Sequence, residues 1–362
     1  MAAHGYRTRL ILTCFGWVPV HYAYVRNAGT SNLLNALGMA TRCTNAARDW
    51  AVRCAVLCGS FAEGHAVLRQ LTGMDVSISK LRKMTLAYGE QCLLAQNKAD
   101  KDVRSYQGRV PKNGETETEH TLFCMLDGTG APCTKKDTAA VKGKHGEAGT
   151  RQIRVILFGE YGWLDNKGRP SPFKGSFSYA VSGEEIFTVS RLVRKLGIAR
   201  GYGTAQRMQC IADGEVALEN ALRDSFPSAI FTNDFMHACE YVHTCCENLG
   251  FSDENAGKEY RFLRGLLYRC GAAAVIKRLE NRYAQALSSS PEAGKALNYI
   301  KKRKENMCYG KLRREGLFIG SGHIEAAARV LVVRRCKQAG MHWRHKNAIR
   351  ISAILAHFRS VA

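Results

Sequence analysis

Three acidic residues stand where their carboxylates could share a metal ion. Asp127 and Asp213 each follow a short apolar run and precede a glycine. Glu325 comes much later, on a helix expected to begin after the Gly320-Ser321-Gly322 break. Divalent cations need several oxygen ligands that converge from separate elements. The three carboxylates together therefore predict a site for Mg²⁺ or Mn²⁺.

Each of these acids also has an ordinary structural explanation. Asp-Gly is a favoured turn dipeptide, so Asp127 and Asp213 could simply end their strands. Arg329 lies one helical turn after Glu325 and could form an ion pair with it worth a few tenths of a kcal/mol. Ser321 is expected to cap the amides at the start of this helix. Spacing alone does not decide between these alternatives.

Asp234 and His237 open another helix, directly after a predicted strand. They are three positions apart and share a helix face, so they could support the metals or orient a water molecule. The alternative is that Asp234 caps the helix and His237 is an interior histidine. Cys239 and His243 lie one turn apart, but no second pair with matching spacing accompanies them, which argues against zinc.

The charge of the chain indicates a polyanionic partner. Its 53 Lys and Arg exceed its 31 Asp and Glu, giving a formal net charge of +22. An anionic membrane surface would favour a single basic amphipathic helix, whereas here the basic residues run along the whole chain. Nucleic acid is therefore the expected partner. The 14 cysteines include no CxxC pair, which favours reduced thiols and therefore a cytoplasmic location. A nucleic-acid partner would place the protein at the nucleoid.

Two basic stretches are candidate DNA contacts. The first lies near the start of a predicted helix, where a recognition helix would face the major groove. The second surrounds a tryptophan, and phosphate contacts with a stacking ring suit distorted DNA ends; a solvated basic surface with a half-buried Trp is the alternative. The candidates are Lys80, Arg82, Lys83, Arg334, Arg335, Lys337, Trp343, Arg344 and Lys346.

The N-terminal part of the chain changes its hydrophobic period. Residues 6–27 alternate apolar and polar positions around a glycine, which predicts a hairpin, although Arg7, Arg9 and the following apolar stretch imitate a signal peptide. A helical period follows. One helix is expected from Ser60 to Gly73, and Ser77 or Ser79 can cap a second. The pair suggests a helix-turn-helix or an ordinary helical hairpin.

The rest of the chain predicts a mixed α/β core with a helical insertion. Short apolar runs that suit strands alternate with helical segments after residue 121, and a purely helical pattern follows residue 235. No run is long and apolar enough to span a bilayer. The expected divisions are residues 1–95 for the hairpin and helix-turn-helix-like region, 96–120 for a linker, 121–234 for the first part of the core, 235–305 for the insertion and 306–362 for core completion.

Several of these segments carry a family resemblance. They are Asn306-Met307-Cys-Tyr309, Gly316-Leu-Phe-Ile-Gly-Ser-Gly-His-Ile-Glu325-Ala-Ala, Arg335-Cys-Lys337-Gln-Ala-Gly-Met-His-Trp343 and Asp234-Phe-Met-His237-Ala-Cys-Glu240. In this order they resemble the insertion-sequence transposases of the ISKra type, bacterial relatives of the Mutator-like DDE superfamily. The stretch from Phe61 to Lys83 resembles the helix-turn-helix of that group.

The resemblance implies a fold and an activity. It implies a ribonuclease-H-like core in which Asp127, Asp213 and Glu325 hold two Mg²⁺ or Mn²⁺ ions, with Asp234 and His237 as supporting catalytic residues. The expected enzyme is a DDE transposase that binds the terminal inverted repeats of its element, cleaves the strand and joins it to target DNA, as a homodimer on DNA. A stand-alone metal-dependent nuclease or resolvase, or a domesticated DNA-binding protein without turnover, is the alternative.

Overall fold

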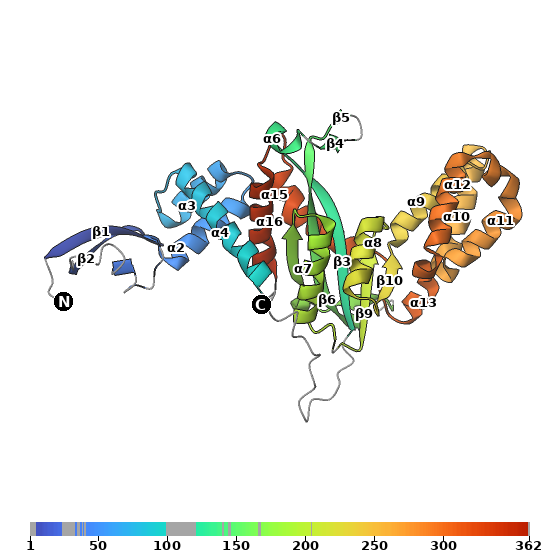
Figure 1. Ribbon diagram of the computed structural model, residues 1–362, viewed down its shortest axis with the longest axis horizontal. Coiled ribbons are helices and arrows are strands. Elements are labelled where there is room, and N and C mark those ends of the chain that lie inside the picture. The colour runs from blue at the N-terminus through green and yellow to red at the C-terminus, as the bar shows by residue number, and fades with distance from the viewer. Residues whose placement is uncertain are drawn as a thin grey trace, which may run out of the picture. The chain divides into compact units, whose positions relative to one another are not determined.

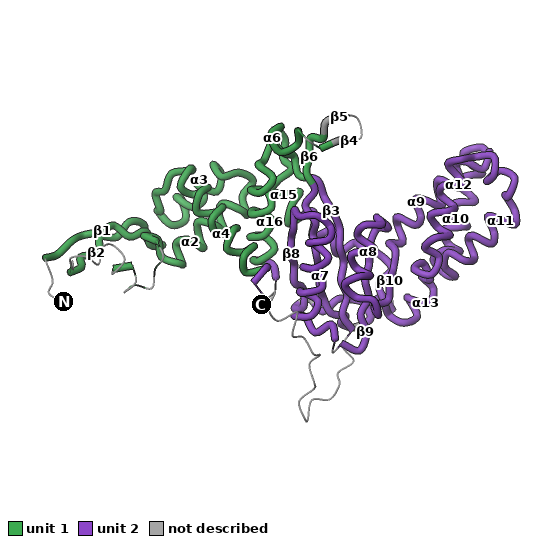
Figure 2. The backbone as a smooth tube through the Cα atoms, in the orientation of Figure 1, with its two compact units in different colours: residues 1–96, 131–151, 330–358 green, residues 97–130, 152–329, 359–362 purple. Residues whose placement is uncertain are grey.

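The computed structural model describes residues 5–23, 33–34, 37, 39, 41–98, 121–139, 141–143, 146–165, 168–203 and 205–360. The chain forms two compact units, coloured separately in Figure 2. Unit 1 comprises residues 1–96, 131–151 and 330–358, and unit 2 comprises residues 97–130, 152–329 and 359–362. The units are therefore interleaved in sequence. Residues 131–151 and 330–358, expected from the sequence in the two parts of the core, belong to unit 1. Most of the expected linker, residues 99–120, lies outside the described residues.

Unit 1 begins with the expected hairpin. Strands β1 (Tyr6–Thr13) and β2 (Gly16–Ala23) are antiparallel, with Thr13 paired to Gly16 across the turn. Gly16 has a φ of 96°, a conformation that residues with a side chain rarely adopt. The glycine therefore makes this tight turn possible.

Three helices follow, and their caps match the sequence signals. They are α2 (Asn45–Leu57), α3 (Phe61–Thr72) and α4 (Ile78–Lys98). The Ser60 hydroxyl accepts a hydrogen bond from the Glu63 amide at the start of α3, and Gly73, at φ 67°, ends this helix. Ser77 accepts from the Lys80 amide at the start of α4. The predicted pair of helices is confirmed, although the DNA-reading role of that pair stays a prediction.

Helices α2 and α3 pack closely against each other. Only Cys58, Gly59 and Ser60 separate these two helices. A Cβ on Gly64 would lie 2.6 Å from the Cys54 carbonyl oxygen, so a glycine is needed where the helices cross. Their shared core includes Ala51, Ala55, Leu68 and Leu81, all buried. The sequence did not single out α2 as a partner of α3.

The remaining parts of unit 1 come from later in the chain. They are α6 (Lys135–Thr138), the short strands β4 (Lys142–Gly143) and β5 (Gly146–Glu147), α15 (Arg334–Cys336) and α16 (His345–Arg359). A Cβ on Gly89 of α4 would lie 2.6 Å from the Arg350 carbonyl oxygen of α16, so these two helices also pack closely. Cys133 forms a β-bridge with Trp343.

Unit 2 contains a mixed sheet of six strands (Figure 1). The strands are β3 (Thr121–Pro132), β6 (Thr150–Leu164), β7 (Pro170–Pro172), β8 (Ser178–Ser182), β9 (Arg207–Ala212) and β10 (Ile230–Asn233). Their order is β10-β9-β3-β6, with both β7 and β8 pairing with β6. Strands β3, β9 and β10 are parallel, whereas β7 and β8 run antiparallel to β6. The expectation of a mixed α/β fold is confirmed.

Helices cover one face of this sheet. α7 (Ile186–Ala199) precedes β9, and α8 (Val216–Ser225) precedes β10. Val189 and Leu222 of these helices share a buried core with Leu122 and Cys124 of β3 and with Cys210 of β9. Since side chains alternate along a strand, the residues between these positions, including Phe123 and Gln209, face the other side of the sheet.

A helical segment follows β10, as the sequence predicts. It comprises α9 (Phe235–Glu247), α10 (Asp253–Cys270), α11 (Ala272–Ser289), α12 (Pro291–Lys302), the short η2 (Lys304–Met307) and α13 (Tyr309–Arg314). These helices share a core of their own, which includes Val242, Leu263, Leu279 and Ile300. Within the described residues, no helix is long and apolar enough to cross a membrane.

The chain then continues into a helix of mixed geometry. α14 (Gly322–Ala328) is followed without a break by the π-helix η3 (Arg329–Val333) and by α15. His323 of α14 packs against Phe123 of β3, with 6.3 Å between the ring centres, and against Phe318 at 5.1 Å. Helix α14 therefore lies on the face of the sheet opposite to α7 and α8.

Candidate active site

Three aspartates lie level with one another along three neighbouring parallel strands, Asp127 within β3 and Asp213 and Asp234 directly after β9 and β10. Met125 of β3 pairs with Ile211 of β9, so continuing this register by two residues brings Asp127 opposite Asp213. Asn233 of β10 pairs with Ala212, which brings Asp234 opposite Asp213 from the other side. Neighbouring strands are about 4.8 Å apart. The sheet therefore brings these three residues together at one edge.

The alternation of the strands also decides which way these residues face. Leu126 and Ala212, the residues just before Asp127 and Asp213, belong to the core beneath α7 and α8. The two aspartates therefore project from the opposite face, against which His323 of α14 packs. Glu325 belongs to that same helix. All three predicted metal ligands thus come from this side of unit 2.

Asp127 differs from the sequence expectation in one respect. The sequence suggested that Asp127 follows a strand that ends before it, but β3 continues to Pro132. Among the described glycines, those with positive φ do not include Gly128, so the alternative of an Asp-Gly turn is also wrong here. The strand continues because β6 lies beside it. Oδ1 of Asp127 accepts a hydrogen bond of 2.6 Å from the Gly128 amide.

Burial raises the pKa of Asp127, because desolvation disfavours the charged carboxylate. The hydrogen bond from Gly128 opposes this shift, while the negative charges of Asp213 and Glu325 add to it. A positive charge on His237 acts in the opposite direction and lowers this pKa. Asp127 thus experiences the charge of both other predicted ligands, and bound cations would relieve this repulsion.

Asp213 follows its strand as expected and also forms the turn. Gly214 has a φ of 98°, and Oδ1 of Asp213 accepts a 2.8 Å hydrogen bond from the Glu215 amide. Such a bond is typical of an aspartate that stabilises its own turn. Asp213 can therefore stabilise its turn and also serve as a metal ligand, because only one of its carboxylate oxygens is engaged in the turn.

Glu325 is exposed on α14, and its contacts differ from those expected. It forms no ion pair with Arg329, although the structure describes both residues. Oε1 of Glu325 instead lies 2.9 Å from the hydroxyl oxygen of Ser321. The prediction that Ser321 caps the helix with its side chain is wrong, because its hydroxyl contacts Glu325 and Asp234 instead of a backbone amide. The sequence did not predict this link between two acids.

Asp234 has the contacts of a buried capping residue. It is 1% exposed, and its Oδ1 accepts a 2.8 Å bond from the His237 amide at the start of α9. Its Oδ2 accepts from the Ser321 amide at 2.6 Å and from the Ser321 hydroxyl at 2.9 Å. Both oxygens are therefore occupied by protein groups. This geometry favours a positioning role over the predicted catalytic role for Asp234.

His237 lies half-exposed at the start of α9. Its Nδ1 is 3.3 Å from Oε2 of Glu240. The histidine is close enough to Asp127 to affect the pKa of that carboxyl group. This location suits a group that orients water. Because the side chain is half-exposed, the alternative that His237 is an interior histidine is wrong.

The side chains of unit 2 suit a hard cation by their chemistry. Carboxylate oxygens are the ligands that Mg²⁺ and Mn²⁺ prefer. In the part of the chain that the structure describes, however, no group of three or more His, Cys, Asp or Glu side chains is close enough to hold a metal ion. The side chain of Glu325 is held by the Ser321 hydroxyl, which also contacts Asp234.

The cysteines and the histidine of the possible zinc site lie on α9. Cys239, Cys245 and Cys246 are buried in the core of the helical segment. Nδ1 of His243 pairs with Glu247 at 3.3 Å. Burial raises the pKa of all three thiols, to about 11 for Cys239 and about 12 for the other two. These cysteines are therefore interior side chains.

No protein-family model matches the chain, and no curated protein matches it significantly.

The predicted DNA contacts all lie in unit 1, where most are exposed or half-buried and two are buried. Arg82, Lys83, Arg334, Lys337 and Lys346 are exposed. Lys80 is half-buried, with its ammonium 4.1 Å from the centre of the Trp17 ring. Arg344 pairs with Asp137 at 2.9 Å. The exposed residues remain accessible for phosphate contacts.

Two of the predicted DNA contacts are interior residues instead. Arg335 is 2% exposed, and its guanidinium donates two 3.3 Å hydrogen bonds to the Ala55 carbonyl at the end of α2. Trp343 is 8% exposed, and its ring nitrogen donates to the Cys336 carbonyl at 3.2 Å. The Arg335 guanidinium also lies 5.0 Å from the Phe61 ring centre. For both residues the prediction of a DNA contact is wrong in this structure, because the packing of unit 1 buries them.

Proposed function

We propose that this protein is a DDE transposase of the ISKra type, which cleaves DNA at the ends of its element and joins them to target DNA. The observation that carries the proposal is the register of the sheet. Extending this register by two residues brings Asp127, within β3, opposite Asp213, which directly follows β9, and Glu325 comes from the helix packed on the same face. Asp127 experiences the charge of both other acids.

The strand order supports a ribonuclease-H-like core as part of this proposal. β8, β6 and β3 lie side by side, and β9 and β10 extend the sheet from β3, each preceded by a helix. Such a sheet brings the part of β3 that bears Asp127 and the end of β9 together with a helix from later in the chain. The helices between Phe235 and Arg314 would then be an insertion between the second and third metal ligands.

Three of the segments that resemble the ISKra-type transposases, those of Asp234, Asn306 and Ser321, meet at the end of β10. Nδ2 of Asn306 donates to Oδ1 of Asn233 at 3.2 Å, and the hydroxyl of Tyr309 donates to the Asn233 carbonyl at 3.0 Å. Ser321 contacts Asp234, the next residue. Residues far apart in sequence therefore support one another beside the proposed ligands. This convergence is consistent with a shared functional site.

The chemistry follows from the carboxylates. Two Mg²⁺ or Mn²⁺ ions, when bound, supply an activated oxygen and neutralise charge on the transferring phosphoryl group. Asp127, Asp213 and Glu325 would hold these ions, and His237 would orient water. Asp234 would position the helix that bears Glu325. Water would attack the element end first, and the released 3′-hydroxyl would then attack target DNA.

The partners in this proposal are double-stranded terminal repeats and target DNA. The net charge of +22 favours a polyanion, and the exposed basic residues of unit 1 are candidate phosphate contacts. Because two element ends must be cut, we expect a homodimer on the DNA. We expect the protein to act in the bacterial cytoplasm, at the nucleoid.

A cleavage assay tests the proposal. Purified protein would be incubated with Mg²⁺ or Mn²⁺ and with duplex DNA that carries the inverted repeats flanking its coding region. Asp127→Asn and Glu325→Gln should abolish strand cleavage and leave gel-shift binding nearly intact. Asp224→Asn, an exposed aspartate of α8, is the matched control and should cleave normally. Cleavage by Asp127→Asn at the wild-type rate would exclude this carboxylate from the site.

A second assay separates the alternatives. A precut end with a free 3′-hydroxyl should be joined to target DNA by the wild-type protein. Cleavage without joining would indicate a stand-alone nuclease or resolvase. DNA binding without cleavage or metal binding would indicate a domesticated DNA-binding protein.

A further inference from the structure

Helix α12 contacts the turn that carries Asp213. The hydroxyl of Tyr299 donates a 3.1 Å hydrogen bond to the carbonyl oxygen of Asp213. Nη2 of Arg303, just after the helix, donates a 2.9 Å bond to the carbonyl oxygen of Gly214. Two successive carbonyl groups of the turn are therefore held by residues four positions apart. Residues at this spacing lie on one face of a helix.

The packing at this contact leaves no spare room. Gly214 has a φ of 98°, and a Cβ at this position would overlap the Tyr299 hydroxyl. The Asp213 side chain is fixed from the other direction by the Glu215 amide. The turn thus has hydrogen bonds on both carbonyls and on one carboxylate oxygen, so its orientation is set by α12 as well as by the end of β9.

The donors on α12 are themselves held in place. Arg303 forms an ion pair with Glu219 of α8, with 3.4 Å between Nε and Oε2. Glu219 also accepts a 2.9 Å hydrogen bond from Asn306. The Tyr299 ring stacks on Tyr241 of α9, with 3.5 Å between the ring centres and 10° between the planes. Both donors are therefore fixed against α8 and α9.

We infer that Tyr299 and Arg303 are positioning residues for the Asp213 carboxylate, and that the helical insertion thereby contributes to the metal site. This inference rests on the proposed function. A metal ligand must be held within about 0.5 Å of its productive position, and hydrogen bonds from neighbouring residues provide this restraint. Loss of such supporting groups typically lowers metal affinity or activity about 10–100-fold.

The chemistry of the two donors suits this role. Burial raises the pKa of Tyr299, with the positive charge of Arg303 opposing the shift, so the phenol remains a donor at neutral pH. The Arg303 guanidinium stays charged under all ordinary conditions. Both groups donate to backbone carbonyls of the Asp213 turn, so they act on the carboxylate through the position of that turn.

The stacked tyrosines provide a matched pair of variants. Tyr299→Phe keeps the ring stack and removes the donor to Asp213, whereas Tyr241→Phe removes one oxygen from the partner ring and leaves that donor in place. Mn²⁺ binding to the full chain without DNA would be measured by the electron paramagnetic resonance signal of the free ion, together with cleavage at varied Mn²⁺ and the melting temperature.

Tyr299→Phe should weaken Mn²⁺ binding about 10-fold. The Mn²⁺ concentration for half-maximal cleavage should rise by a similar factor, and high Mn²⁺ should partly restore cleavage. Tyr241→Phe should bind Mn²⁺ as the wild type does. A Tyr299→Phe protein that melts earlier but binds Mn²⁺ normally would overturn the inference, since the hydroxyl would then have a structural role only.

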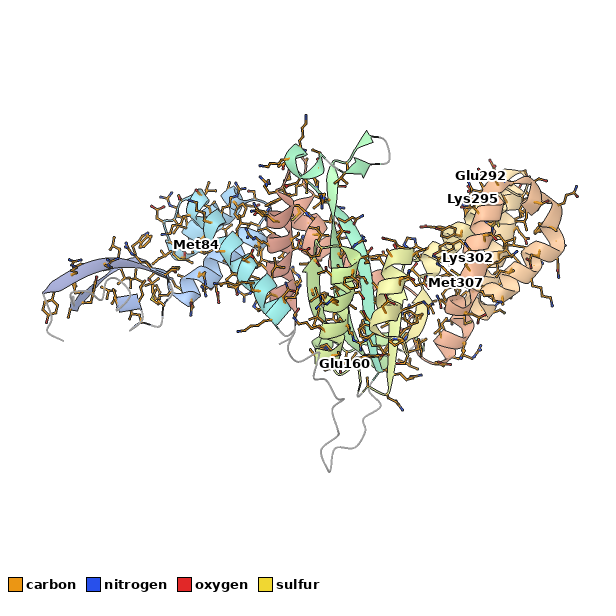
Figure 3. All side chains as sticks on the ribbon, viewed as in Figure 1. Met84, Glu160, Glu292, Lys295, Lys302 and Met307 are labelled. Atoms are coloured by element: carbon orange, nitrogen blue, oxygen red, sulfur yellow. The ribbon has the colours of Figure 1, made fainter. Side chains whose placement is uncertain are left out.

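Arg303→Gln gives an independent measurement. It should also weaken Mn²⁺ binding, whereas Lys302→Gln, on the adjacent exposed position labelled in Figure 3, should not. If the wild-type chain binds no Mn²⁺ and cleaves no DNA, the proposed function fails and the inference fails with it. If the wild type does both and both α12 variants match it, the inference alone fails.

Discussion

Ser321 is joined to Asp234 by two hydrogen bonds, of 2.6 Å from its amide and 2.9 Å from its hydroxyl, both to Oδ2. The same hydroxyl oxygen lies 2.9 Å from Oε1 of Glu325. A serine hydroxyl has a single proton, so it can donate to only one of these two carboxylates at a time. Ser321 therefore links the buried cap of α9 to the proposed metal ligand on α14.

Replacing Ser321 by alanine should remove the link and keep the amide bond to Asp234. We expect Mn²⁺-dependent cleavage to fall about 10–100-fold, because Glu325 loses the group that orients it. The Mn²⁺ concentration for half-maximal cleavage would show this loss. Ser288→Ala, an exposed serine of α11, is the control. Equal Mn²⁺ dependence of the two variants would contradict the role assigned to Ser321.

Replacing Asp127 by asparagine should stabilise the metal-free protein. Because burial and the neighbouring acids raise the pKa of Asp127 in the folded state, its ionised form costs stability. This cost is absent at low pH, where Asp127 is protonated in both states. It grows as the pH rises above the ordinary aspartate pKa of about 3.9, and it is complete above the folded pKa.

Thermal unfolding in the presence of a chelator checks this expectation. At pH 7 the Asp127→Asn protein should have a higher melting temperature than the wild type. The difference should shrink as the pH is lowered toward 4. With saturating Mn²⁺ the wild type should have the higher melting temperature, since only the wild type keeps this metal ligand. A lower melting temperature for the metal-free variant would refute the predicted electrostatic cost.

Replacing Arg335 by methionine should destabilise unit 1. The guanidinium satisfies the Ala55 carbonyl near the end of α2, where helix carbonyls lack partners within the helix. A buried carbonyl left without a donor costs about 1–3 kcal/mol. Chemical denaturation measures the loss of folding free energy. Arg334→Met, its exposed neighbour, should change stability by less than about 0.5 kcal/mol. Similar losses from both variants would contradict the structural role of Arg335.

Replacing Arg82 and Lys83 together by alanine should weaken DNA binding in a salt-dependent way. Both side chains are exposed near the start of α4. If each neutralises one phosphate, the slope of log K against log salt should fall by about 0.9 for each of the two residues. Fluorescence anisotropy at several salt concentrations measures this slope.

The matched control for this pair is Lys295 and Lys302, exposed on α12 and labelled in Figure 3. Alanine at both positions removes the same charge from unit 2. An equal change of slope in the two double variants would indicate that net charge, and not the surface of α4, determines binding.

Much of the local structure follows from the sequence. Ser60, Ser77 and Gly73 define the ends of α3 and the start of α4, because capping depends on residues only a few positions away. The strand-forming runs before Asp127 and Asp213 are also evident, since short β-branched and apolar segments suit a buried sheet. The sequence predicts these elements nearly at their observed positions.

The positions of the side chains within these elements could not be predicted in the same way. The extension of β3 past Asp127 depends on β6 beside it, and the burial of Arg335 depends on α2 and Trp343. Nothing in the spacing of Ser321 distinguishes a helix cap from a link between two acids. Tyr299 lies 86 residues from the Asp213 carbonyl to which it donates, so no local pattern indicates the contact.

The sequence by itself determined the types of the elements, the excess of positive charge and the three acids that are candidates for a shared ion. The tertiary structure decided which of these residues meet. Strand register sets the positions of Asp127 and Asp213 because hydrogen bonding between parallel strands admits only one alignment at a time. The contacts of Ser321 and of Tyr299 depend on how helices from distant parts of the chain pack within unit 2, and packing is a property of the folded chain alone.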